Sequence, residues 1–271
     1  MIDEAENEIR LISSPSGALT RSYATSLVRR GLNDLVVKAE ADEWCKKGLT
    51  LWCDGKHIEA VRCFALGVQA DPNHAALQFY LGLAYYLGIG MPERDYAQAA
   101  ICWRRAAEQG HAQAQNNLAQ AYKEGHGVAR DYVEAACWYR KAAEQNLAVA
   151  QFNLGVLYEL GRGLPQDFAQ ASTWYRKAAE QGYAVAEYNL GGLLRLGRGV
   201  TQNDSEAAYW YRRAAVQGHT AAQFNLAAMY GLGQGVPQDP EKSSFWYRKA
   251  SEQGGSGGLK DSSDIIAGGS E

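Results

Sequence analysis

The sequence predicts an all-α solenoid in which antiparallel helix pairs stack one after another. An octet recurs almost unchanged at Trp138–Gln145, Trp174–Gln181 and Trp246–Gln253. Its alanines return every 36 residues, at Ala106, Ala142, Ala178, Ala214 and Ala250. Such a period is typical of repeats that cannot bury an apolar face alone and form a continuous core by stacking.

The first helix of each unit is predicted from an apolar stripe. In the unit 148–183 the stripe runs through Ala150, Leu154, Leu157 and Tyr158, at spacings that place one face of a helix toward the core. Four copies carry an Asn-Leu pair at the matching position of this helix.

A glycine turn and a capping residue separate the two helices of a unit. Gly161 ends the first helix because glycine readily adopts positive φ. Asp167 stands at the N-cap of the second, where a carboxylate accepts from unpaired backbone N–H groups. The second apolar stripe is formed by Ala171, Trp174, Tyr175 and Ala178. We interpret the recurring Trp-Tyr pair as core packing.

Different elements are predicted upstream. Positions 41–74 carry the signature of a 34-residue tetratricopeptide unit, at Trp44, Gly48, Ala60, Phe64 and Pro72. A capping helix is predicted over 19–38, with a detachable partner-binding helix as the alternative. Residues 1–18 are expected to be flexible.

The unit 148–183 resembles the Sel-like repeat (SLR), a 36-residue variant of the tetratricopeptide fold. Five copies are assigned to 75–111, 112–147, 148–183, 184–219 and 220–254, and 255–271 is expected to be a disordered tail or an appended linker. The resemblance implies a right-handed superhelix that acts as an adaptor in signalling or complex assembly, often in bacteria. Some relatives have paired cysteines that bridge the helices of a unit, and this sequence lacks that pairing.

The overall composition excludes several classes of function. With 27 basic and 30 acidic residues the net charge is −3, which does not favour binding to nucleic acid or to an anionic membrane. Met1–Arg10 lacks the pattern of a secretory signal, and no apolar stretch approaches a membrane span. We therefore expect a soluble, cytoplasmic protein whose five cysteines are reduced.

The sequence offers no catalytic constellation, and we predict neither enzyme activity nor a cofactor or metal. His111 and His219 occupy a repeat position that Leu147 and Tyr183 fill in other copies, which favours packing over metal ligation. The Gly-x-Gly loops lack the Lys-Ser or Lys-Thr that would continue a phosphate loop.

The candidate binding residues lie on the first helices, which the resemblance places along the concave face. One amide precedes the core leucine in four of the five copies, at Asn117, Asn153, Asn189 and Asn225. An amide both donates and accepts, so it could hold a peptide backbone. In tetratricopeptide peptide-binders an asparagine at the matching offset contacts the ligand. The alternative is architectural, with each amide bonded to a neighbouring repeat.

Specificity would come from positions that differ between copies. Three residues past the amide stands Gln120 in one copy, and six past it stand Lys123, Glu159 and Arg195. These positions predict a groove of mixed charge. Lys123 and Arg195 are two repeats apart, so the carboxylate clamp of chaperone-binding tetratricopeptide domains is not expected.

Together these features predict a scaffold that binds a protein or an extended peptide in its concave groove; they do not specify an oligomeric state, and a monomer is the default. An exported effector that binds a host protein is the alternative. An enzyme, or a fragment of one, with its site in the groove is the third possibility, and it lacks the acid, base or metal groups it would need.

Overall fold

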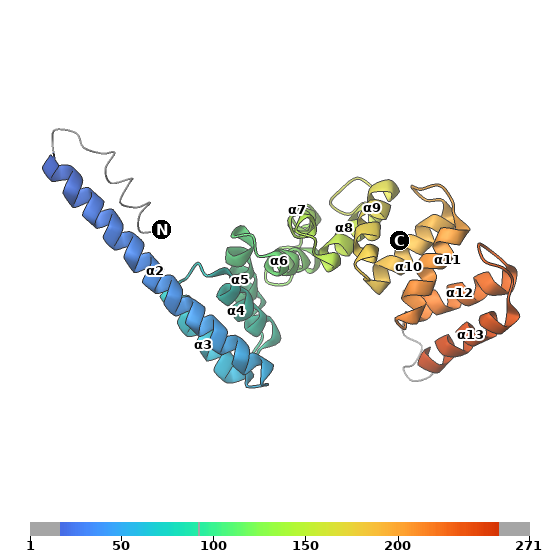
Figure 1. Ribbon diagram of the computed structural model, residues 1–271, viewed down its shortest axis with the longest axis horizontal. Helices are drawn as coiled ribbons and strands as arrows, with labels where there is room; N and C mark the ends of the chain where they lie inside the picture. The colour runs from blue at the N-terminus through green and yellow to red at the C-terminus, as the bar shows by residue number, and fades with distance from the viewer. Residues whose placement is uncertain (1–16, 92, 255–271) are drawn as a thin grey trace. The chain divides into compact units, whose positions relative to one another are not determined.

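The computed structural model describes residues 17–91 and 93–254, which are helical with short connections and contain no strand (Figure 1). The chain divides into two compact units, residues 1–111 and 112–271. Neighbouring helices pack as pairs within each unit, so the predicted all-α class of paired helices is confirmed. The predictions for 1–16 and 255–271 concern residues outside the described ranges.

Unit 1 contains four described helices. They are α2 (Gly17–Cys53), α3 (His57–Ala70), α4 (Ala75–Leu87) and α5 (Tyr96–Glu108). The single helix α2 spans both the predicted capping helix 19–38 and the first helix of the predicted unit 41–74, because residues 33–47 contain no glycine or proline to end it.

The core of unit 1 lies between α2, α3 and α4. Phe64 is fully buried and stacks on Tyr80 with 5.2 Å between ring centroids. Gly48 lies against the Phe64 ring, where an added Cβ would come within 2.4 Å of Cε1. A glycine is therefore required where α2 and α3 approach.

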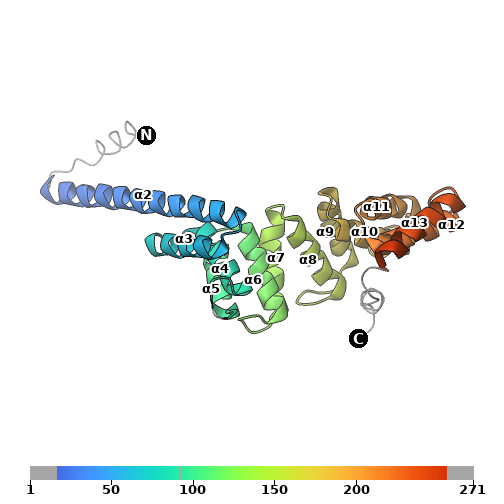
Figure 2. The same cartoon turned by 90° about the horizontal axis from the view of Figure 1, so that it is seen from below.

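Unit 2 contains four helix pairs, which follow one another in chain order (Figure 2). Their bounds are α6 (Ala112–Glu124), α7 (Tyr132–Glu144), α8 (Ala148–Leu160), α9 (Phe168–Glu180), α10 (Ala184–Leu196), α11 (Asp204–Val216), α12 (Thr220–Leu232) and α13 (Pro240–Gly254). The predicted N-caps are present: the Asp167 carboxylate, for example, accepts from Ala169 N at 2.9 Å and Gln170 N at 3.0 Å.

A buried tyrosine fills the space between the two helices in the first three pairs of unit 2. Tyr139, Tyr175 and Tyr211 have at most 1% of their surface exposed. Gly155 of α8 lies under the Tyr175 ring, and an added Cβ there would come within 2.7 Å of it. The small residue lets the helices approach, as the alternation of large and small residues in the sequence indicates.

A buried amide, which the sequence analysis did not single out, links successive pairs. Gln151 of α8 is 2% exposed, and its Nε2 donates to the Ala143 carbonyl of the preceding repeat at 3.2 Å. Its Oε1 accepts from Gln181 Nε2 at 2.8 Å. Because a buried polar group is costly without partners, this arrangement fixes how one pair sits on the next.

None of the helices within the described ranges combines the length and the apolar character that crossing a bilayer would require. All five cysteines are free thiols.

We predict that Gly199→Ala destabilises the protein far more than Gly182→Ala. Both glycines have positive φ, +67° at Gly199 and +83° at Gly182. An added Cβ at Gly199 would also come within 2.3 Å of the Phe168 backbone. An added Cβ at Gly182 would have no atom of the described residues within 4 Å apart from those of its chain neighbours. Urea unfolding should show a loss of about 1 kcal/mol for Gly182→Ala and about 3 kcal/mol or more for Gly199→Ala. Equal losses would contradict the close approach.

We predict a pH signature at Glu187, which takes the place of the buried glutamine in α10. Glu187 is fully buried, with Arg213 Nε 2.8 Å from its Oε1 and Gln217 Nε2 donating to its Oε2 at 2.8 Å. Burial raises the pKa of Glu187, and Arg213 opposes this rise. The folded state therefore holds the proton more tightly than the unfolded chain, so the free energy of unfolding falls as pH rises above the ordinary carboxyl pKa of about 4.3.

Glu187→Gln, which restores the amide of the neighbouring repeats, should remove this contribution to the pH dependence. Urea unfolding of both proteins between about pH 4 and pH 8 measures the difference in slope. Parallel curves would show that Glu187 does not titrate as its burial requires.

Candidate protein-binding face

The structure places the eight predicted site residues on the first helix of each pair in unit 2. We call this surface the A-helix face. It consists of Asn117, Gln120 and Lys123 on α6, Asn153 and Glu159 on α8, Asn189 and Arg195 on α10, and Asn225 on α12. Arg195 is exposed and the other seven side chains are half-buried.

Three of the four asparagines contact the neighbouring repeat. Asn153 Nδ2 donates to Asn116 Oδ1 at 3.5 Å, a long hydrogen bond. The Asn189 amide acts on the Tyr175 hydroxyl, and the Asn225 amide acts on the Tyr188 and Tyr211 hydroxyls, in each case opposing the rise in the tyrosine pKa that burial causes. These contacts support an architectural contribution from the amides.

These amides can nevertheless form further hydrogen bonds. A primary amide has two N–H donors and two acceptor lone pairs, so one bond to a neighbouring repeat uses only part of its capacity. Asn117 Oδ1 accepts from Asn116 Nδ2 at 3.3 Å, within its own helix. The architectural and binding interpretations of the asparagines are therefore compatible.

The hydroxyl groups of the buried tyrosines reach the A-helix face. The sequence analysis assigned these residues to the core and did not predict this contribution. Tyr139 donates to Gln120 Oε1 at 2.7 Å, and the Gln120 amide in turn bonds to Glu124. Tyr175 donates to Glu159 Oε2 at 2.5 Å. The tyrosines and the asparagines recur at the same 36-residue interval, and this shared interval was the sequence feature that could have indicated their proximity.

The partner of the tyrosine hydroxyl changes in the next repeat. The Tyr211 hydroxyl interacts with Arg195 and Asn225, which oppose the rise in its pKa that burial causes. Burial is the main cause that raises the pKa of both Tyr175 and Tyr211, so both phenols stay protonated at neutral pH. The face therefore presents an amide, then a carboxylate, then a guanidinium along successive repeats.

The two histidines that share a repeat position, His111 and His219, serve packing and capping. His219 caps α12, where its Nδ1 accepts from Ala222 N at 3.2 Å, and its ring stacks on Tyr188 at 4.6 Å. His111 stacks on Phe79 in unit 1. The described residues contain no group of three His, Cys, Asp or Glu side chains suited to holding a metal ion.

Comparison with known protein families matches five spans of the chain to the Sel1 repeat. The spans are 75–111, 112–147, 148–183, 184–219 and 220–255. No curated protein matches the chain in sequence.

Solved structures give two close similarities. A protective antigen present in uropathogenic Escherichia coli strains, which displays an SLR fold, shares 36% identity and a TM-score of 0.75 over 83% of this chain and 48% of its own. The present chain thus spans about half the length of that antigen. A Sel1 repeat protein from Oxalobacter formigenes shares 33% identity and a TM-score of 0.71, over 78% of this chain and 83% of its own.

We predict that Tyr175→Phe costs about 1–2 kcal/mol of folding stability although the ring stays in place. The substitution removes the donor to Glu159 and the hydroxyl beside which the Asn189 amide lies. Urea unfolding measures the loss, and Phe152→Leu, a change in the packing beside the same ring, is the control. An unchanged stability for Tyr175→Phe would show that these hydrogen bonds contribute nothing net.

Proposed function

We propose that this chain, which belongs to the Sel1 repeat family, is a scaffold that binds a protein or an extended peptide along its A-helix face. Sel1 repeat proteins are commonly scaffolds for protein–protein interaction and are typically non-catalytic. The finer role that we propose is a cytoplasmic adaptor in bacterial signalling or complex assembly.

The observation that carries this proposal is the band of half-buried polar groups on the first helices. It runs from α6 to α12 and combines one asparagine per repeat with the tyrosine hydroxyls of the second helices. Side chains held in place by hydrogen bonds lose little conformational freedom when a partner binds. Such a band is suited to gripping an extended backbone, which offers one donor and one acceptor per residue.

Specificity in this proposal comes from the residues that differ between repeats. Gln120, Glu159 and Arg195 each contact a tyrosine hydroxyl, but they differ in charge. A partner with complementary groups in the same order would be favoured, and one with like charges would be disfavoured. The core can therefore stay constant from repeat to repeat while the recognised sequence changes.

Capture of partners from the protein's own cells tests the proposal. We predict that Asn153→Ala combined with Asn189→Ala lowers the recovery of the partner about tenfold or more, the effect of losing about 1.4 kcal/mol. The folding stability should fall by only about 1–2 kcal/mol, because each amide has one contact in the neighbouring repeat.

The matched control is Gln170→Ala combined with Thr173→Ala, two exposed polar positions on the second helix α9. This variant should retain the partner. A partner held equally by the native protein and by a folded Asn153→Ala, Asn189→Ala variant would move the binding site away from the A-helix face.

A further inference from the structure

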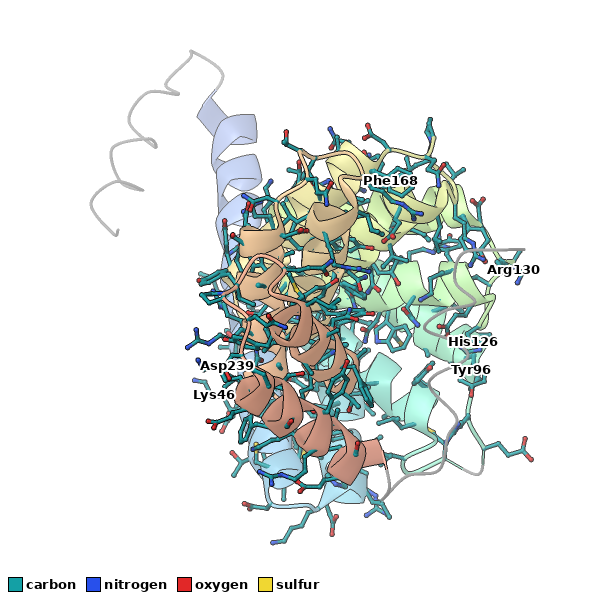
Figure 3. The ribbon with its side chains drawn as sticks, turned by 90° about the vertical axis from the view of Figure 1, so that its right-hand side faces the viewer. Lys46, Tyr96, His126, Arg130, Phe168 and Asp239 are labelled. Atoms are coloured by element: carbon teal, nitrogen blue, oxygen red, sulfur yellow. The ribbon has the colours of Figure 1, made fainter. Side chains whose placement is uncertain are left out.

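A cavity with excess positive charge lies within unit 2, beside the connection from α6 to α7. Its volume is about 400 Å³. It is lined by the end of α6 and the following loop, by Tyr132 at the start of α7, and by the last turns of α8 with Arg162 beyond them. His126 and Arg130 of the loop lie along the same outer edge (Figure 3).

Three permanent cations line this cavity against one carboxylate. Lys123 Nζ lies 3.8 Å from Glu124 Oε1, and His126 Nδ1 lies 3.3 Å from Glu124 Oε2. The Arg130 side chain has no hydrogen bond or ion pair with the described residues, and the Arg162 guanidinium, which has none either, lies 5.6 Å from the centroid of the Tyr132 ring. Two guanidinium groups therefore face the cavity without an anionic partner among these residues.

The wall opposite these charges is apolar. Val156 and Leu157 come from α8, and Leu160 at the end of that helix is 40% exposed. An anion that fits here would carry an apolar group next to its charge. Because Arg130, Leu160 and Arg162 are all exposed, the cavity opens to solvent and does not enclose a ligand.

The combination of Lys123 and Arg130 is particular to this repeat, whereas the position of Arg162 is again an arginine, Arg198, in the next repeat. Later repeats have Gln166, Gln202 and Gln238 at the position of Arg130. Gln166 and Gln238 fold back and donate to the carbonyls of Glu159 and Gly231, each at 2.8 Å. The position of Lys123 is taken by Glu159 one repeat later. The repeat fold thus forms without these cations.

We propose that this cavity binds an aspartate or glutamate side chain that stands next to an apolar residue within an extended segment of the partner protein. The guanidinium groups of Arg130 and Arg162 would hold the carboxylate, since guanidinium–carboxylate contacts are among the stronger charge-assisted hydrogen bonds. The apolar neighbour would lie on Val156 and Leu160.

The open mouth of the cavity fits an internal residue of a continuing chain. Lys123 belongs both to the cavity and to the A-helix face, so a segment bound on that face can reach the cavity. In this respect the inference rests on the proposed function and assigns one chemical requirement to the partner.

Two capped tripeptides probe this site directly, acetyl-Leu-Glu-Leu-amide and its matched acetyl-Leu-Gln-Leu-amide. Each is titrated into the full-length, isotopically labelled protein, and amide chemical shifts are followed by NMR. We expect saturable shifts at residues 123–132 and 156–162 with the glutamate peptide, and affinity about tenfold lower with the glutamine peptide.

Arg130→Gln combined with Arg162→Gln should weaken binding of the glutamate peptide about tenfold. The matched control is Arg198→Gln combined with Arg248→Gln. Arg198 lies 5.7 Å from the Phe168 ring centroid, much as Arg162 lies over Tyr132, and the control removes the same net charge outside the cavity. It should bind the peptide like the native protein.

Three results would overturn the inference: no saturable shifts around the cavity, equal affinity for the two peptides, or equal weakening in the two double variants. Each of these leaves the proposed function standing if the partner is still lost from the Asn153→Ala, Asn189→Ala variant. Failure of that capture experiment, together with specific binding of the glutamate peptide, would instead keep the cavity and reject the A-helix face.

Discussion

The contact of a buried tyrosine with a small residue on the facing helix is the interaction on which the packing of α6 to α11 depends. The Tyr175 ring fills the space between α8 and α9 only because Gly155 lets the helices approach, and Gly191 serves Tyr211 in the same way. The ring supplies buried area, while its hydroxyl must find a partner. That partner lies on the first helix, so the packing of the core determines where polar groups emerge on the A-helix face.

Continuity from one helix pair to the next depends on a second buried polar contact. Gln151 bonds to the end of the preceding repeat and to Gln181 of its own. In α10 this role passes to Glu187, which brings Arg213 as a partner. The exchange shows that the position requires hydrogen bonds more than a particular charge. The core and its polar links are thus nearly constant, whereas residues such as Lys123, Glu159 and Arg195 vary where a partner could contact them.

The periodicity of the sequence was sufficient to predict the helix pairs, the glycine turns and N-caps such as Asp167, because these depend on local backbone chemistry. The prediction that separated a helix over 19–38 from the unit beginning at 41 had no helix breaker behind it, and α2 runs through both. The contact of Asn189 with the Tyr175 hydroxyl joins different repeats, and spacing along the chain does not reveal such contacts. The same holds for the cavity, where Arg130 and Arg162 come from two different loops.

The central claim is that a protein partner contacts the first helices and not the second. A photo-crosslinking amino acid, introduced singly in the protein's own cells, tests this most directly. Val156 and Ala228 are half-buried positions on first helices, and Thr173 and Tyr209 are exposed positions on second helices. The account predicts that the same partner is crosslinked from Val156 and Ala228 and is not crosslinked from Thr173 or Tyr209. Crosslinking confined to Thr173 and Tyr209 would contradict it.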